Sequence, residues 1–156
     1  MSIETITGPV YVVGPMSGRP RLNWGSFKRV WGLFFYRGRV LPTMPHQLEC
    51  GAYSVDEWLD AIDASSLRLD EIDANGFAGS VRHILDVRPT LVAIEGWRES
   101  EGTRAEVAVA QRLRLPVFEV VYEDGVPVGL NPLCDAVDPW YNKRRTGVTR
   151  RTRPRL

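Results

Sequence analysis

Short apolar runs alternate along the chain with longer segments whose apolar residues recur every three or four positions. Runs such as residues 10–13 and 91–94 are typical of buried strands, whereas the longer spacing is typical of amphipathic helices. The alternation predicts an α/β fold. We expect a single domain with a largely parallel sheet of four to five strands, flanked by helices.

The clearest unit covers residues 91–120. The apolar run 91–94 is followed by a charged loop at 95–102, an amphipathic segment that stops at Pro116, and a second apolar run at 117–121. Strand, loop, helix and strand in this order form a βαβ unit, as in Rossmann-like and flavodoxin-like sheets. Ligands of such sheets bind where a strand ends and the next helix begins.

The first half of the chain predicts further elements of the same kind. A strand at 10–13 is followed by a helix at 24–36, for which Asn23 is the expected N-cap. A second strand is expected at 39–41. His46 falls in the loop after it, where it is either an ordinary loop residue or a ligand contact.

The middle of the chain predicts two helices. Ser54 is the expected N-cap of a helix at 55–72, the pair Asn75-Gly76 is expected to break the pattern, and a further helix is expected at 77–86. Two turns are expected after the last strand of the βαβ unit, at 123–125 and at 129–132.

Composition fits one compact domain. The chain has 156 residues, of which 44% are apolar and 25% charged, enough to bury a core. No apolar run is long enough to span a bilayer, so no membrane partner is expected. The N-terminus has neither a basic region nor a long apolar region, and the two cysteines, Cys50 and Cys134, are far apart. These features favour a cytoplasmic protein with reduced thiols.

Charge divides the chain in two. The net charge is only +1, but seven basic residues and no acid follow Asp138. We expect a folded domain at 1–139 and a basic, disordered tail at 140–156. Binding of nucleic acid through this tail is the alternative interpretation.

Most catalytic motifs are missing. The two histidines and two cysteines match no metal-ligand spacing, and neither a Walker sequence, a G-x-G-x-x-G loop nor a G-x-S-x-G elbow occurs. Neither a metal nor a cofactor is therefore expected. Acid–base chemistry or attack by a carboxylate remains.

Glu106 suits such a role, because it lies near the N-terminus of the predicted helix, which should hold its carboxylate anionic. An anionic carboxylate can attack an electron-poor carbon. Ser100, Gly102 and Thr103 lie at the same helix end and can bind a phosphate through hydroxyls and amides. The plainer interpretation is that Ser100 or Thr103 only caps the helix.

The loop after the first strand is a second candidate for ligand binding. Gly14 and Gly18 allow a close approach of the backbone, and the amides of Met16, Ser17 and Gly18 can donate to an anion. Pro15 has no amide proton to donate.

Three segments carry a family resemblance. Residues 10–18 (V-Y-V-V-G-P-M-S-G), with Asn23 and Phe27, resemble the opening of the nucleoside 2-deoxyribosyltransferase-like superfamily. The likeness is to a branch of uncharacterised, often phage-borne proteins that begin Y-(I/V)-x-G-P-M-(T/S)-G. Residues 95–106 are similar to the G-W-x-x-S-x-G-x-x-x-E motif of that branch, and residues 115–117 to the end of the same unit. The resemblance covers residues 9–122.

The resemblance implies roles for individual residues. Glu106 falls on the family's catalytic glutamate, which attacks C1′ of the deoxyribose, and Tyr11 falls on a tyrosine that hydrogen-bonds this glutamate. The family also has an aspartate that protonates the departing base. Asp63 is the expected counterpart here, with Asp70 or Asp73 as substitutes.

Two further positions concern the substrate and the oligomer. Ser100 falls where the transferases have an aspartate on the 5′-hydroxyl and the related 5′-monophosphate N-glycosidases have a serine on the phosphate. A hydroxyl can donate to a phosphate that a carboxylate would repel, which favours a nucleotide substrate. Asn131 falls on an asparagine that enters the site of a neighbouring subunit. The resemblance thus implies a homodimer or higher homo-oligomer.

The expected function is that of an N-glycosyl enzyme acting on a 2′-deoxynucleoside or its 5′-monophosphate. The 14–18 loop and the 100–103 segment would hold the sugar and phosphate. Transfer to water or to a second base stays open, because the choice depends on closure of the pocket. The alternatives are a nucleotide-binding module without turnover and a DNA-associated protein that uses the basic tail.

Overall fold

The computed structural model describes residues 2–64 and 69–137, with side chains from residue 76 onward in the second range. The basic tail predicted at 140–156 lies outside the described residues. So do the side chains of Asp70 and Asp73.

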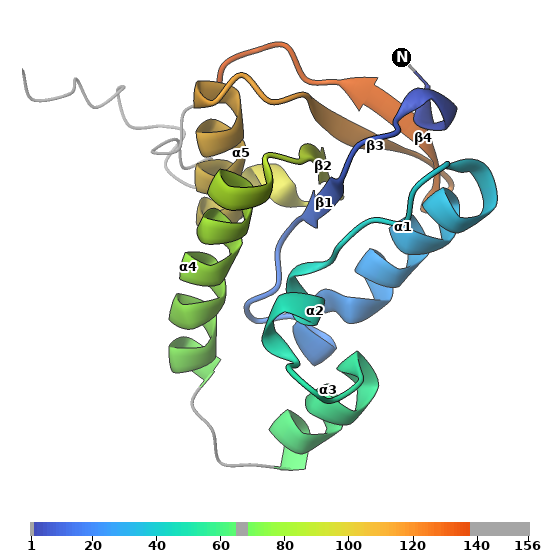
Figure 1. The fold of residues 1–156 in the computed structure, drawn as a ribbon. Helices are drawn as coiled ribbons and strands as arrows, with labels where there is room; N and C mark the ends of the chain where they lie inside the picture. The colour runs from blue at the N-terminus through green and yellow to red at the C-terminus, as the bar shows by residue number, and fades with distance from the viewer. Residues whose placement is uncertain (1, 65–68, 138–156) are drawn as a thin grey trace, which may run out of the picture.

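One four-stranded sheet forms the centre of the fold, in the order β1-β2-β3-β4 (Figure 1). β1 (Val10–Val13), β2 (Thr90–Ala93) and β3 (Val117–Glu123) are parallel, and β4 (Val126–Pro132) returns antiparallel to β3. The prediction of a largely parallel sheet in an α/β fold is confirmed.

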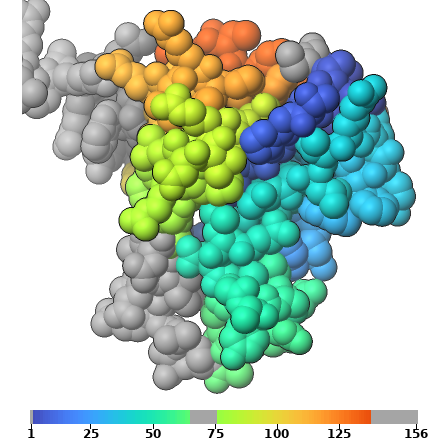
Figure 2. Space-filling model, in the orientation of Figure 1, coloured from blue at the N-terminus to red at the C-terminus, as the bar shows by residue number. Residues whose placement is uncertain are grey.

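Helices cover both faces of the sheet. α1 (Trp24–Arg37) lies on one side of the strands, and α4 (Leu69–Val87) and α5 (Glu101–Arg112) lie on the other (Figure 1). α2 (Pro45–Glu49) and α3 (Val55–Ala64) lie at the carboxyl ends of the strands. In the space-filling view the segment that contains α2 lies beside the described part of α4 (Figure 2).

The alternation of side chains along β1 divides the core into two layers. Val10 and Val12 belong to the core cluster that includes α1. Tyr11 and Val13 belong to the cluster with α4 and α5. Successive strand residues point to opposite faces, so this register places Tyr11 in the same layer as α5, the helix that carries Glu106.

The strand predicted at 39–41 does not form. The segment contributes a single bridge, in which Thr43 N donates to Val10 O (2.9 Å) and Val12 N donates to Thr43 O (3.0 Å). Pro42 has no amide proton for a ladder, and α2 begins at Pro45, so only one residue is left to pair.

The segment predicted as a helix at 55–72 is helical in its described parts, in α3 (residues 55–64) and at the start of α4 (residues 69–72), and residues 65–68 lie outside the described residues. Two other local predictions need correction. Asn75-Gly76 does not end a helix, because α4 continues through it. A single glycine costs a helix only about 1 kcal/mol, which packing against the sheet offsets. The turn predicted at 129–132 does not form. These residues belong to β4, which pairs with β3.

Of the two helix caps predicted from the sequence, one forms and one does not. Ser54 caps α3 as predicted, since Glu57 N donates to its hydroxyl (3.2 Å). Asn23 does not cap α1. Its backbone is left-handed (φ 63°), and its side-chain amide donates to Pro15 O (2.8 Å) instead.

Candidate active site

A cavity lies at the carboxyl ends of β1 and β2, between the loop after β1, the start of α5, and α2 to α4. We call it the Glu106 cavity. Seven of the residues predicted for the site line it: Gly14, Met16, Ser17, Ser100, Gly102, Thr103 and Glu106. Its volume is about 120 Å³, several times the ~15 Å³ that one water molecule requires, so it is larger than a packing defect.

Glu106 is the buried carboxyl of this cavity. It is only 8% exposed, and burial raises its pKa from 4.5 to about 7. The expectation that the helix N-terminus holds it anionic is therefore wrong. Glu106 lies in the second turn of α5, where the effect of the helix end has faded and loss of solvation dominates.

A buried hydrogen-bond relay reaches Glu106 from behind. Ser80 of α4 donates from Oγ to Glu106 Oε2 (2.8 Å), and the Tyr11 hydroxyl contacts the same Oγ. A serine has one proton, so Tyr11 must donate to Ser80. Burial also raises the pKa of Tyr11, which keeps that proton in place. Tyr11 thus reaches Glu106 through Ser80, not through the direct bond that the resemblance implies.

Replacing Ser80 by alanine should destabilise the fold. The Tyr11 hydroxyl and the Glu106 carboxyl would both lose their partner, at a cost of roughly 1–3 kcal/mol for each orphaned buried group. The change should also raise the pKa of Glu106 further, because the Ser80 hydrogen bond lowers it. Urea unfolding measures the first effect. Ser26→Ala on α1 is the control, and equal stability of both variants would refute the relay.

The start of α5 supplies hydrogen-bond donors. Ser100 is the N-cap, as the plainer interpretation predicts: its Oγ accepts from Thr103 N (3.3 Å) and from Thr103 Oγ1 (2.9 Å). A hydroxyl has two acceptor sites and one proton, so both acceptor sites are used and the proton remains for a ligand. Gly102 N precedes the first intrahelical bond, from Arg104 N to Ser100 O, and adds a second donor.

The opposite wall was not predicted from sequence. It is formed mainly by apolar side chains from η2 (Pro20–Asn23), α2, α3 and α4: Leu22, Pro45, Trp58 and Phe77. One further carboxyl, Glu49 of α2, lines the same wall. It is half-buried, and burial raises its pKa.

Two glycines of the β1 loop have different roles. A Cβ at Gly14 would lie 2.2 Å from Ile94 Cγ1, so glycine is required there for packing against the end of β2 as well as for the cavity. Gly18 is exposed, has a φ of +71°, and is not among the residues that line the cavity. The structure therefore does not place Gly18 at the cavity, as its predicted contact with a ligand would require.

The rim of the cavity holds a strained turn. Arg21, Leu22 and Asn23 are all left-handed (φ 49°, 51° and 63°), a conformation that costs a non-glycine residue about 1 kcal/mol. His46 holds the turn through the hydrogen bond between its Nε2 and Leu22 O (2.8 Å). His46 is fully buried in α2, and burial lowers its pKa to about 4. The prediction that His46 lies in a loop is therefore wrong, and His46 is not among the residues that line the cavity.

Asp63 does not reach the cavity. Its carboxylate accepts from Arg21 Nη1 (2.9 Å), its side chain is 58% exposed, and it is not among the lining residues. Asp56, Asp60 and Asp63 lie along one side of α3, and all three pair with Arg21. These ion pairs connect α3 to the strained turn, because Arg21 is part of that turn.

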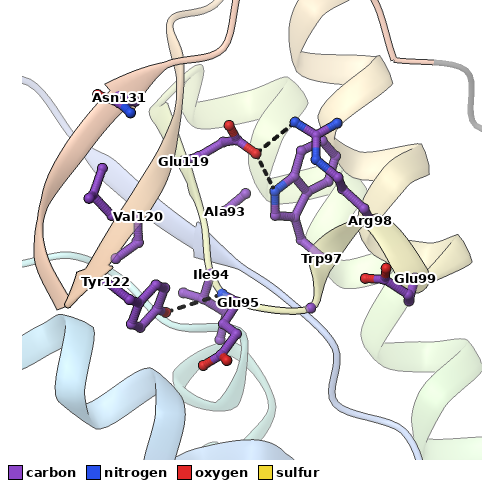
Figure 3. A pocket seen from close by; sticks show the side chains of 12 residues that line it. Ala93, Ile94, Glu95, Trp97, Arg98, Glu99, Glu119, Val120, Tyr122 and Asn131 are labelled. Carbon is purple, nitrogen blue, oxygen red and sulfur yellow. Dashed lines mark hydrogen bonds and ion pairs between the residues drawn. The ribbon is translucent and has the colours of Figure 1, made fainter. Parts of the chain in front are cut away.

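Asn131 lies in a different place. It lines a larger hollow of about 370 Å³ between the loop after β2 and the β3–β4 hairpin (Figure 3). Here Glu119 accepts from Trp97 Nε1 (3.0 Å) and from Arg98 Nη2 (2.8 Å), and Glu95 N donates to the Tyr122 hydroxyl (3.1 Å). Many of its polar groups thus pair with one another.

The smaller cavity is the better candidate for chemistry. It combines a buried carboxyl whose pKa is shifted towards neutrality with unpaired donors at a helix end, which is typical of active sites. Among the described side chains, those of residues 2–64 and 76–137, no three His, Cys, Asp or Glu gather as a metal site would require. In the same residues, no helix has the length and apolar character needed to cross a membrane.

Comparisons with known proteins add no relative: no family model matches the chain, and neither a curated protein nor a solved structure does. The resemblance to the deoxyribosyltransferase-like superfamily therefore rests on the motif residues alone. What the site does must be argued from its chemistry.

Proposed function

We propose that the protein is an N-glycosyl enzyme that removes or exchanges the base of a 2′-deoxynucleoside 5′-monophosphate, with Glu106 as nucleophile. The observation that carries the proposal is the buried Glu106 carboxyl, which faces a cavity and is held from behind by Ser80 and Tyr11. The motif resemblance gives the same residue the same role.

In the proposed reaction, ionised Glu106 attacks C1′ of the deoxyribose. A bond forms between C1′ and a carboxylate oxygen, and the bond from C1′ to the base nitrogen breaks with its electron pair going to the base. Burial makes the carboxylate a stronger nucleophile, because little water solvates it. The Ser80–Tyr11 relay fixes the orientation of the attacking group. Water or a second base then releases the sugar from Glu106.

A phosphate suits the start of α5. The free proton of Ser100 and the amide of Gly102 are donors, and a helix N-terminus favours an anion. Ser17 of the β1 loop lines the same cavity and adds a hydroxyl. These groups support a nucleoside monophosphate over a free nucleoside.

The proposal includes a cytoplasmic homo-oligomer. The resemblance gives Asn131 a place in the site of a neighbouring subunit, and this residue is exposed on β4, which is an edge strand among the described strands. An edge strand can approach a second copy of the chain.

Substituting Ser100 by aspartate tests the phosphate assignment. Aspartate keeps the N-cap but places a negative charge where the phosphate would lie. Loss of one hydrogen bond to a charged group, worth about 1.5–3 kcal/mol, should raise the KM for monophosphates at least ~10-fold and leave that for deoxynucleosides within a few-fold. Chromatography of released base, over all common deoxynucleosides and their monophosphates, measures both.

The control is Ser54→Asp, the same change at the N-cap of α3, which should alter neither KM. Equal effects of Ser100→Asp on both substrate classes would contradict the phosphate site. If the wild-type chain binds nucleotides but releases no base from any of them, the binding module without turnover is the correct interpretation.

A further inference from the structure

Glu49 is the second carboxyl of the Glu106 cavity among the described residues that line it. It is the last residue of α2, a short helix fixed in place by its neighbours. Met44 N donates to Gln47 Oε1 (2.7 Å) at the start of this helix, and His46 is anchored to Leu22 O. A group on such a rigid element keeps its position, as a catalytic group must.

Two glycines of α4 make room for the Glu49 carboxyl. A Cβ built on Gly79 would lie 3.1 Å from Glu49 Oε1, and a Cβ built on Gly76 would lie 4.0 Å from it. These glycines are three residues apart and so share one side of the helix. The Glu49 carboxyl therefore lies against the backbone of α4 at Gly79, the residue before Ser80. A larger side chain at Gly79 would crowd the carboxyl.

The hydrogen bonds of the two carboxyls differ. Ser80 donates to Glu106 and so favours its charged form. Among the described contacts, Glu49 accepts no hydrogen bond, and burial raises its pKa. A base that enters beside Glu49 displaces water from it and favours its neutral form further. Glycosyl transfer needs one ionised carboxylate and one protonated carboxyl, and of these two only Glu106 has a described hydrogen-bond donor that stabilises its ionised form.

We propose that Glu49 is the general acid that protonates the departing base while Glu106 attacks C1′. The proposal rests on the proposed function. As the bond between C1′ and the base nitrogen breaks, its electron pair goes to the base, and the proton of the Glu49 carboxyl transfers to a ring nitrogen. Glu49 is left as a carboxylate and takes up a proton from the water or base that completes the reaction. Asp63, bound to Arg21 outside the cavity, is not needed.

The test compares ordinary and activated leaving groups. Glu49→Gln should lower base release from the preferred deoxynucleoside monophosphate by about 10²–10⁴-fold, the usual contribution of a general acid. With an activated analogue, N7-methylated for a purine or 5-fluorinated for a pyrimidine, the base leaves more readily without a proton. The rate for this analogue should be clearly less affected in Glu49→Gln, and the acid-dependent limb of the pH profile should disappear.

Gly79→Ala is a second variant that keeps the carboxyl. Its Cβ forces Glu49 Oε1 to move by a few tenths of an ångström, so release of ordinary bases should fall and release of the activated base should fall less. Alanine favours a helix over glycine by about 1 kcal/mol, so this variant should fold. Glu123→Gln on the β3–β4 hairpin is the matched control and should leave all rates unchanged.

The outcomes separate the two proposals. A wild-type chain that releases no base at all refutes the proposed function. A wild-type chain that is active, with Glu49→Gln losing equal factors on both kinds of leaving group or losing nothing, refutes the role of Glu49 alone. A loss in Asp63→Asn that the activated analogue restores would give the role to Asp63 instead.

Discussion

Base release falls at least ~10³-fold when Glu106 is replaced by glutamine, if this carboxylate is the nucleophile. An amide of the same size fills the same space and still accepts a hydrogen bond from Ser80, but it cannot attack C1′. The measurement is single-turnover release of base from the preferred monophosphate, followed by chromatography. A factor of this size corresponds to about 4 kcal/mol of barrier.

The matched control is Glu123→Gln, at the exposed last residue of β3 and not among the residues that line the cavity, which should retain full activity. Circular dichroism of both variants shows whether the fold is intact. Activity of Glu106→Gln within ~10-fold of the wild-type chain would exclude a covalent role for Glu106, since loss of a nucleophile has larger effects.

The same substitution should change how stability depends on pH. In the folded chain burial raises the pKa of Glu106 to about 7, against an ordinary value of 4.5. Between pH 4.5 and 7, Glu106 therefore keeps its proton in the folded state but has lost it in the unfolded state. The resulting stabilisation of the fold is complete below pH 4.5 and is lost as the pH rises through 7. The expected loss is about 3 kcal/mol, from roughly 1.4 kcal/mol for each pKa unit.

His46 has the opposite effect over almost the same range. Burial lowers its pKa from 6.5 to about 4, so the stabilisation that it contributes is present above pH 6.5 and is lost as the pH falls through 4. The two slopes largely cancel in the wild-type chain between pH 4.5 and 6.5. Stability alone thus conceals both groups, and only the difference between chains isolates Glu106.

The informative quantity is the free energy of unfolding of Glu106→Gln minus that of the wild-type chain, from urea unfolding at pH 4.5 to 8. It should rise by about 3 kcal/mol up to pH 7 and then stay level. The cost of burying an amide shifts the whole curve but does not tilt it. A flat difference curve would mean that Glu106 ionises as an exposed glutamate does, and that burial in the cavity does not desolvate it.

The sequence was most informative where one contiguous segment forms one edge of the site. Ser100 and Glu106 lie on a single helix that follows β2, so the spacing within the βαβ unit sufficed to predict that both approach the same cavity. Gly14 and Ser17 follow β1, whose carboxyl end meets that of β2 in a parallel sheet. Local pattern and sheet geometry are enough for these residues.

Ser80 and Glu49 could not be found in this way. They come from α4 and α2, whose positions depend on tertiary packing and not on a strand end. One signal was present: Ser80 lies four residues before buried Ile84, so it is a polar residue on the buried side of a helix, where a hydroxyl needs a partner. For Glu49 the signal was the pair of glycines at positions 76 and 79, of which only Gly76 was interpreted, as part of a helix break at Asn75-Gly76.

Asp63 shows the limit of assigning a role by resemblance. The expectation depended on the resemblance to the family's aspartate, and spacing alone does not determine which side of a helix faces the site. In the folded chain Arg21 lies beside α3 and pairs with the whole acidic row. A long-range partner of this kind is visible only in three dimensions.

The most direct test is to look for the sugar on Glu106. The wild-type chain is mixed with its preferred deoxynucleoside 5′-monophosphate, quenched in acid during turnover, digested and analysed by mass spectrometry. We expect deoxyribose phosphate on the peptide that contains Glu106, a matching amount of free base, and neither product from Glu106→Gln. Release of base without an adduct, or an unchanged rate in Glu106→Gln, would contradict Glu106 as nucleophile, and the absence of any base release would contradict the glycosyl enzyme altogether.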